Sequence, residues 1–279
     1  MAGHPQYPPT VRVSADGRVY AWWTNRVSPS GLSSMIIGEA GVKSRYEHTT
    51  VGAILPGPDG TLFTSAGLFT PELTKKGGPT SGIAIPAAQG SFYLSVTTPP
   101  SAKLPRQQPV AVGVNLLMLG ESRPLAELGN LEGLDPPTGP INIRPGQGPQ
   151  LLLTDRVYLV PDAKALVILN GTAEKVIIHK VDVDELLKKA DINFLFVTSK
   201  PPAAERGTMF TYTPLVKSKK GGVKLKLDAG PDGMKVVGDK IVWDVPKRYA
   251  ADDVSVIINV SDAGGQEAYD SFTLVVKDR

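Results

Sequence analysis

Residues 51–64 read VGAILPGPDGTLFT, and this stretch shows the pattern that organises much of the chain. Two apolar runs flank Pro-Gly-Pro-Asp-Gly, in which proline fixes the backbone, aspartate hydrogen-bonds to it and glycine accepts a left-handed turn. A turn of this kind between short apolar runs is typical of a β-hairpin. The same arrangement recurs at residues 10–22, 81–94 and 157–169. The sequence therefore predicts a protein built from short hairpins.

Recurrence of the hairpin indicates a repeat architecture. The turn residues Asp16, Asp59, Gln89 and Asp162 are spaced irregularly within residues 10–195. A hydrophobic strand, a Pro-Asp-Gly turn and a second hydrophobic strand resemble the blades of WD-repeat-like and quinoprotein-like bacterial propellers, although this region contains no Trp-Asp dipeptide. At about 40–50 residues per blade, it holds at most about four blades. Known propellers have about four to eight.

The resemblance therefore implies a partial propeller. We expect further blades to precede this sequence, or other copies of the chain to complete the propeller by oligomerisation. A complete but irregular β-domain is the alternative. Two proline-rich stretches, residues 99–109 and 135–149, are expected to be exposed loops. Residues 182–190, DVDELLKKA, predict a short helix, because aspartates cap its start and lysines occupy its last turn.

The C-terminal part has a more regular strand pattern. Residues 198–207 contain two prolines and a glycine and are expected to form an exposed linker. About seven short strands follow, and Val254, Val256, Ile258 and Val260 alternate along one of them. Short alternating strands at this density are typical of a β-sandwich, in which every second side chain points into the core.

Four motifs in this part occur in the order expected of a known family. They read PPAAERGTMFTY (201–212), AGPDGMKV (229–236), IVWDVP (241–246) and VSDAGGQ (260–266). Residues 197–277 thus resemble the Ig-like domain of bacterial surface and exported proteins, which is related to cadherin-like and dystroglycan-type modules. The order of Gly238 and Asp239 departs from the family, as does one extra residue after the tryptophan. The two resemblances imply an all-β chain, with propeller-like blades at residues 1–197 and an Ig-like β-sandwich at residues 198–279.

Charge and composition argue against several functions. With 30 basic and 27 acidic groups the net charge is +3, so a general role in nucleic-acid binding is not indicated. The lysines within residues 217–226 fit a solvated strand edge that blocks pairing with other sheets. Cysteine is absent, which excludes disulfides, thiolate metal sites and thiol catalysis.

The sequence leaves the compartment open. Residues 1–10 show no signal peptide, and no apolar stretch reaches transmembrane length. The resemblance to Ig-like modules of surface proteins favours an extracytoplasmic or cell-envelope location.

No residues form a recognisable catalytic pattern. The GxSxG, HExxH and P-loop motifs are absent. His4 lies in the N-terminal tail, His48 lies between strands and His179 lies within an apolar strand. A zinc site needs at least three protein ligands. We therefore predict no catalytic residues, no cofactor and no metal site.

Calcium needs separate consideration, because some relatives of the Ig-like module bind it at acidic edges. The candidate ligands here would be Glu205, Asp252, Asp253 and Asp262. A calcium site needs six to eight oxygen ligands, and the chain contains no DxDxDG loop. We expect these carboxylates to have structural roles.

Aromatic residues gather near the N-terminus and suggest a binding surface. Adjacent tryptophans in a strand point to opposite faces, so one can be exposed while the other serves the core. The predicted surface comprises Trp22, Trp23, Arg45, Glu47 and His48, with Arg26 nearby.

These observations favour a noncatalytic interaction, scaffolding or adhesion protein of bacterial type, with a protein or glycan as partner. The alternative is a propeller enzyme, either a hydrolase or lyase or of quinoprotein type, whose axial active site lies largely outside this chain. A structural repeat within a larger envelope protein is a third possibility.

Overall fold

The computed structural model describes residues 9–24, 27–38, 41–77, 82–97, 113–134, 141–142 and 150–279. In this part of the chain nearly all regular structure is β-strand, and the single α-helix is short. The prediction of an all-β protein is therefore confirmed. The chain divides into two compact units, Met1–Ala190 and Asp191–Arg279.

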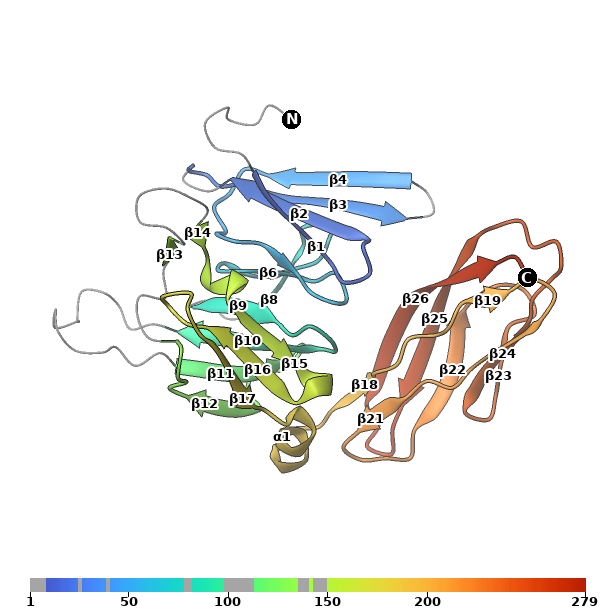
Figure 1. The fold of residues 1–279 in the computed structure, drawn as a ribbon. Helices are drawn as coiled ribbons and strands as arrows, with labels where there is room; N and C mark the ends of the chain where they lie inside the picture. The colour runs from blue at the N-terminus through green and yellow to red at the C-terminus, as the bar shows by residue number, and fades with distance from the viewer. Residues whose placement is uncertain are drawn as a thin grey trace. The chain divides into compact units, whose positions relative to one another are not determined.

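Three four-stranded antiparallel sheets follow one another in the first unit (Figure 1). Each is a meander, so strands that are consecutive in sequence are neighbours in the sheet. The first sheet contains β1 (Pro9–Val13), β2 (Val19–Thr24), β3 (Leu32–Gly38) and β4 (Gly41–Glu47). The second contains β5 (Leu55–Pro56), β6 (Leu62–Thr64), β7 (Gly67–Phe69) and β8 (Lys75–Gly77). The third contains β9 (Ile83–Pro86), β10 (Phe92–Thr97), β11 (Gly113–Met118) and β12 (Ala126–Gly129).

A fourth sheet of three antiparallel strands completes the first unit. It contains β15 (Val157–Val160), β16 (Ala165–Leu169) and β17 (Val176–Lys180). The short pair β13 (Ile141–Asn142) and β14 (Gln150–Leu151) precedes it, with the 3-10 turns η2 (Leu153–Asp155) before β15 and η3 (Pro161–Ala163) after it. Asp155 of η2 forms an ion pair with Arg12 of β1, so this lead-in segment returns to the first sheet.

All four predicted hairpins are present, as the pairs β1–β2, β5–β6, β9–β10 and β15–β16. The second shows why the turn residues matter. The Asp59 carboxylate accepts hydrogen bonds from the Thr61 amide at 3.0 Å and the Thr61 hydroxyl at 2.7 Å. Gly60 adopts φ +81°, a conformation that favours glycine.

The predicted short helix is confirmed as α1 (Val183–Lys189). The Asp182 side chain accepts a hydrogen bond from the Glu185 amide at 3.1 Å and so caps the helix start. Lys188 and Lys189 lie in the last turn, where cations stabilise the helix dipole. The two proline-rich stretches lie outside the described residues, except for 141–142 in β13.

Successive sheets of the first unit pack face to face. Trp23, Ala21 and Leu32 of the first sheet share a core cluster with Leu62 and Phe69 of the second. These side chains are 0–8% exposed, so they bury one face of each sheet.

The opposite face of the second sheet packs on the third. Leu55, Phe63 and Leu68 share a cluster with Tyr93 and Leu117. The rings of Phe63 and Tyr93 lie 5.4 Å apart between centroids. The second sheet is thus covered on both faces.

The third sheet is covered in turn by the fourth. Strands β9 and β15 are in contact, and the Ala88 amide donates to the Leu159 carbonyl at 2.8 Å. Leu94 and Leu116 are opposite one another on the face away from Tyr93, and both are 0% exposed, as is Leu166 of the fourth sheet. The four sheets therefore form a stack in chain order.

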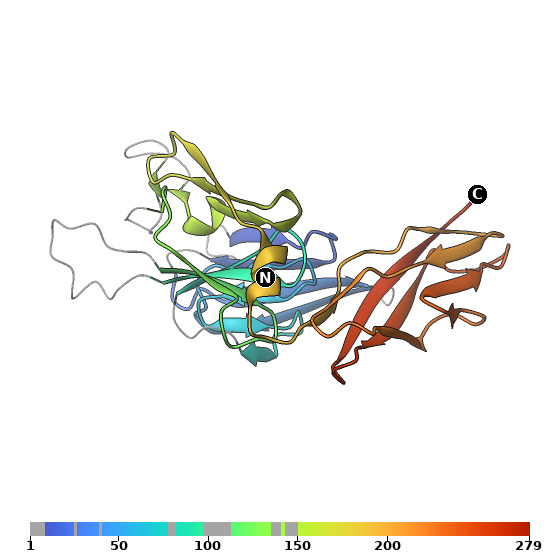
Figure 2. The same cartoon turned by 90° about the horizontal axis from the view of Figure 1, so that it is seen from below.

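The second unit contains two main sheets and one short strand pair (Figure 1 and Figure 2). The four-stranded sheet has the order β19 (Ala204–Glu205), β26 (Glu267–Lys277), β25 (Asp253–Ser261) and β22 (Lys224–Ala229). The three-stranded sheet has the order β20 (Met209–Tyr212), β24 (Lys240–Asp244) and β23 (Lys235–Val237). The pair is β18 (Leu195–Val197) with β21 (Val216–Ser218).

One core cluster lies between these two main sheets. It joins Phe210 and Trp243 of the three-stranded sheet to Val256, Ile258 and Leu274 of the four-stranded sheet. Each is at most 4% exposed. The alternation predicted for β25 and β26 therefore places the expected side chains inside a β-sandwich.

The second unit starts before the residue pattern suggested. Residues 195–197 form β18 and pair with β21, so they belong to the second unit. Within the expected linker 198–207, Ala204 and Glu205 form β19 and pair in parallel with β26. This segment is held by backbone hydrogen bonds, which composition alone does not reveal.

At the other border of the four-stranded sheet, β22 is an edge strand. Lys224 and Lys226 are exposed along it, in agreement with the predicted solvated edge. Charged side chains at such an edge oppose pairing with further strands.

Candidate functional site

The two adjacent tryptophans of β2 point to opposite faces of the first sheet. Trp23 is 2% exposed and belongs to the core between the first and second sheets. The Arg12 guanidinium lies 5.8 Å from the centroid of its ring. Trp22 is half-buried on the other face. The structure thus assigns Trp23 to the core and leaves Trp22 as the candidate for recognition.

Strand β4 carries the other predicted site residues, and its seven residues are all exposed. Tyr46 is opposite Ser33, which is opposite Trp22, so these three side chains share one face. Arg45 and Glu47 alternate with Tyr46 and therefore point to the other face. The predicted cluster is split by this register, with Trp22 on one side and Trp23, Arg45 and Glu47 on the other.

His48 follows β4 and is tied to the same side as Tyr46. The Tyr46 hydroxyl lies 3.0 Å from His48 Nδ1, and the two rings meet edge to face at 6.3 Å between centroids. An added Cβ at Gly31 would lie 3.1 Å from Tyr46 Cε2, so the tyrosine ring rests against this glycine. His4 and Arg26 lie outside the described residues.

The strand registers place twelve side chains on the face that carries Trp22 and Tyr46. We call it the outer face, because it points away from the second sheet. Its members are Pro9, Val11, Val13, Tyr20, Trp22, Thr24, Ser33, Met35, Ile37, Val42, Ser44 and Tyr46.

The outer face is mainly apolar and carries no charged side chain. Val42 is 62% exposed, Tyr46 58%, Val11 52% and Val13 48%. A sheet face that meets water normally alternates to polar and charged residues. A contiguous exposed apolar face instead indicates a contact surface. Sequence reasoning missed the valines, although the apolar residues on both faces of β2 are the signal that could have revealed them.

In the described part of the chain, no group of three or more His, Asp and Glu side chains is placed to hold a metal ion. His179 Nε2 lies 3.0 Å from the Glu132 carbonyl oxygen. In the first unit Arg156 is buried, which lowers the pKa of its guanidinium, and it donates to the Leu169 carbonyl at 3.2 Å.

Two of the carboxylates considered for calcium take part in the architecture of the second unit. Arg206 donates to Asp252 at 2.8 Å, to Asp278 at 2.9 Å and to the Tyr249 carbonyl at 2.9 Å. Asp262 accepts hydrogen bonds from the Ser218 hydroxyl at 2.7 Å and the Gly264 amide at 2.8 Å. The Ser218 hydrogen bond contributes most to lowering the pKa of Asp262.

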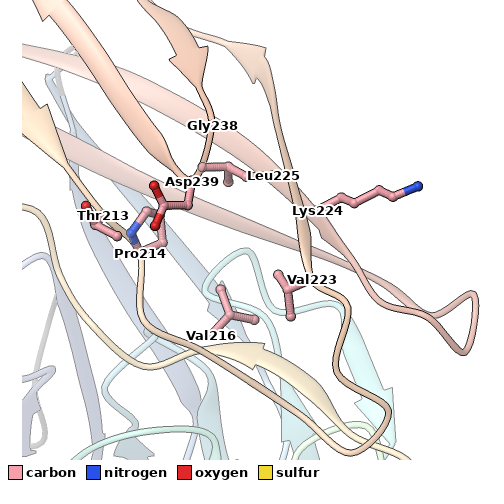
Figure 3. A pocket seen from close by; sticks show the side chains of 8 residues that line it. All are labelled: Thr213, Pro214, Val216, Val223, Lys224, Leu225, Gly238 and Asp239. Carbon is pink, nitrogen blue, oxygen red and sulfur yellow. The ribbon is translucent and has the colours of Figure 1, made fainter.

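The second unit contains a pocket of about 510 Å³ (Figure 3). Val216 and Val223 face each other across it, while Asp239 lies beside Pro214 and the Lys224 side chain points away. Its walls combine apolar and polar groups. Asp239 is the charged side chain that remains at the pocket, and one carboxylate does not make a catalytic pair.

Among the carboxylates that the structure describes, Asp270 is the one whose pKa is raised. It lies on the core-facing side of β26, opposite Ile258. Burial raises its pKa, and Lys200 offsets part of that effect. The neighbouring Tyr212 also has a raised pKa, mainly through burial, and its hydroxyl donates to the Ser199 carbonyl at 2.9 Å. The tyrosine is engaged in holding two segments together.

We predict that Asp270→Asn stabilises the second unit at neutral pH but not in acid. The folded state binds the Asp270 proton more tightly than the unfolded chain, because burial raises the pKa. The free energy of unfolding therefore falls as pH rises from the ordinary carboxyl pKa through the raised one, and stays lower above it. The thermal unfolding midpoint of the variant should be higher than that of the unmodified protein at neutral pH, and the two midpoints should agree in acid. Asp239→Asn, at an exposed site, is the control, and an equal Asp270→Asn gap at both pH values would contradict the prediction.

Comparisons with known proteins leave the family open. No protein-family model and no curated protein matches the chain. Among solved structures, it is similar to an endo-fucoidan hydrolase of glycoside hydrolase family 107, with 12% identity and a TM-score of 0.26, covering 100% of this chain and 38% of that one. It is similar to the extracellular domain of a chain described as a hybrid two-component system of B. thetaiotaomicron, with 9% identity and a TM-score of 0.27, covering 100% and 45%.

A polysaccharide lyase is similar at 14% identity and a TM-score of 0.22, covering 100% of this chain and 47% of that one. The chain spans less than half the length of each of these proteins. TM-scores this low do not establish a shared fold. Within the described residues, no helix is both long and apolar enough to span a membrane.

Proposed function

We propose that this chain is a noncatalytic interaction protein whose contact surface is the outer face of the first sheet. The observation that supports this function best is the exposure of Val11, Val42 and Tyr46 on a face without charged side chains. Removing such a surface from water costs little desolvation free energy, because it carries no charge. Burial of its apolar area contributes about 25 cal/mol of binding free energy for each Å².

The composition of the outer face favours a protein partner over a glycan. Its exposed members are mainly valine and isoleucine together with Tyr46, while the rings of Tyr20 and Trp22 are half-buried. Sheets that pack on sheets do so through this kind of side chain, which interdigitates at about 10 Å between layers. Glycan binding would need more polar groups beside the aromatic rings, and Ser33 is already buried.

The first unit supplies this surface as a set of propeller-like blades. Its sheets are meanders, they stack in chain order, and their first strands β1, β5, β9 and β15 contact one another in sequence. This arrangement supports the proposed resemblance to propeller blades. In the second unit, four strands facing three support an Ig-like sandwich, which would act as a spacer or cap.

The proposed surface can be tested by hydroxyl-radical footprinting. Tyr46 and Met35 of the outer face are compared with Tyr269 and Met209 of the second unit, which are 66% and 63% exposed. Adding an extract of the cells that produce the protein should protect Tyr46 and Met35 while the two controls stay reactive.

Digesting the extract with protease before mixing identifies the class of partner. Protection that disappears after digestion supports a protein partner, whereas protection that survives digestion would replace it with a glycan. If Tyr46 remains as reactive as Tyr269 with and without extract, the outer face is not an interaction surface and the proposed function is wrong.

A further inference from the structure

The fourth sheet presents a second exposed apolar face, at the other end of the stack. We call it the terminal face, because it points away from the third sheet. Its members are Tyr158, Val160, Ala165, Val167, Leu169, Val176, Ile178 and Lys180.

The terminal face resembles the outer face in chemistry. Ile178 is 69% exposed, Val176 64% and Tyr158 52%. Lys180, at one corner of the sheet, is the single charged member. On the opposite face, Val157, Leu159, Leu166 and Ile168 are at most 1% exposed and pack inward, while Ile177 and His179 of β17 are half-buried. The fourth sheet is therefore mainly apolar on both faces, although one of its faces meets solvent.

The stack shows which face fits which. Each sheet has a forward face, which points toward the following sheet in the chain, and a backward face, which points toward the preceding one. At every junction, the forward face of one sheet packs on the backward face of the next. Phe63 of the second sheet meets Tyr93 of the third in this way. The outer face is the backward face of the first sheet, and no forward face covers it. The terminal face is the forward face of the fourth sheet, and no backward face covers it. One chain thus carries both halves of one further junction.

The two faces do not cover each other within one copy. Val11 on the outer face and Ile178 on the terminal face are both more than half exposed. Side chains covered by each other would be buried, as Phe63 and Tyr93 are.

We propose that the terminal face of one copy packs on the outer face of a second copy, so that the chain associates head to tail. This inference rests on the proposed function and names the partner of the same surface. The contact is heterologous, because two different patches meet, and such contacts close into rings or continue as chains. The near absence of charge allows the two faces to approach without burying an unpaired ion.

The first test measures the mass of the full chain in solution by analytical ultracentrifugation. The unmodified protein should sediment as species of at least two copies. Val11→Lys places one charge on the outer face and Ile178→Lys places one on the terminal face, and each variant alone should lose this association. Val237→Lys, at a 54% exposed residue of the second unit, is the matched control and should keep it. Far-ultraviolet circular dichroism checks that each variant is folded.

Mixing the variants tests the head-to-tail arrangement directly. Val11→Lys retains an intact terminal face and Ile178→Lys retains an intact outer face. The mixture should therefore form a complex of exactly one copy of each, and nothing larger, because only one junction remains. Packing of like face on like face would not be restored in this way.

The outcomes separate this inference from the proposed function. A monomeric unmodified protein, association unaffected by either lysine, or a mixture that stays monomeric would each overturn head-to-tail association. If Tyr46 is still protected by extract in those cases, the outer face binds another protein and the proposed function stands. If Tyr46 is not protected either, both are wrong.

Discussion

Replacing Trp243 by alanine is expected to destabilise the second unit by about 3–5 kcal/mol, the range for removing a large aromatic side chain from a core. Trp243 is 1% exposed and lies in the cluster between the two main sheets of the unit. Its Nε1 donates to the Asp232 carbonyl at 3.1 Å, and its ring meets Tyr249 edge to face at 5.0 Å between centroids. Alanine removes the volume, the hydrogen bond and the ring contact together.

Amide hydrogen exchange resolved by residue measures this effect where it occurs. Amides of β24 and β25 should exchange faster in Trp243→Ala, while those of β10 and β11 in the first unit keep their protection, because mutational effects at distant sites are largely independent. Tyr269→Ala, at a residue that is 66% exposed, is the control and should change little. Unchanged protection in β24, or equal loss in β10, would show that the tryptophan does not organise its own unit.

Local sequence signals predicted the elements of this fold well, since each signal acts over a few residues. The turn at Asp59 and Gly60 is fixed by a side-chain hydrogen bond and a positive φ, both of which residue type dictates. The capped helix start at Asp182 has the same local origin. The alternation along β25 also decides which side chains enter the core, because successive residues of a strand point to opposite faces.

Long-range pairing was the part that the sequence did not reveal. Ala204 and Glu205 pair with β26, about 70 residues away, so a proline-rich stretch that looks like a linker is held in a sheet. For the same reason, the sequence did not show that the predicted binding residues lie on two different faces of the first sheet. The separation of Arg45 from Tyr46 follows from alternation, but the alignment of Tyr46 with Trp22 depends on the registers of three strands.

Exposure of an apolar residue is equally hard to read from sequence. Val19 of β2 is 6% exposed and Val11 of β1 is 52% exposed, yet both are valines in alternating strands. What differs is whether another sheet lies above them. The outer and terminal faces could therefore be recognised only once the stacking order was known.

Phe63→Ala is expected to cost the first unit about 3–5 kcal/mol, because it opens a cavity between two sheets. Phe63 is 1% exposed and shares a cluster with Leu55 and Leu68 of its own sheet and Tyr93 of the next. An added Cβ at Gly57 would lie 2.7 Å from Phe63 Cε2, so the ring also supports the Pro-Gly-Pro-Asp-Gly turn.

Two measurements test this prediction, the midpoint of chemical denaturation and the hydrogen exchange of individual amides. Amides of β6 and β10 should lose protection together in Phe63→Ala, because the ring joins the second sheet to the third, while β24 in the second unit is unaffected. Phe63→Leu fills part of the space and should cost less. Val176→Ala, at a residue 64% exposed on the terminal face, is the solvent-facing control and should leave the unfolding midpoint of the isolated copy unchanged. If Phe63→Ala lowered the protection of β6 but not of β10, each sheet would be stable without its neighbour. Face-to-face packing would then not hold the stack together, and the head-to-tail contact, which uses the same kind of packing, would lose its basis.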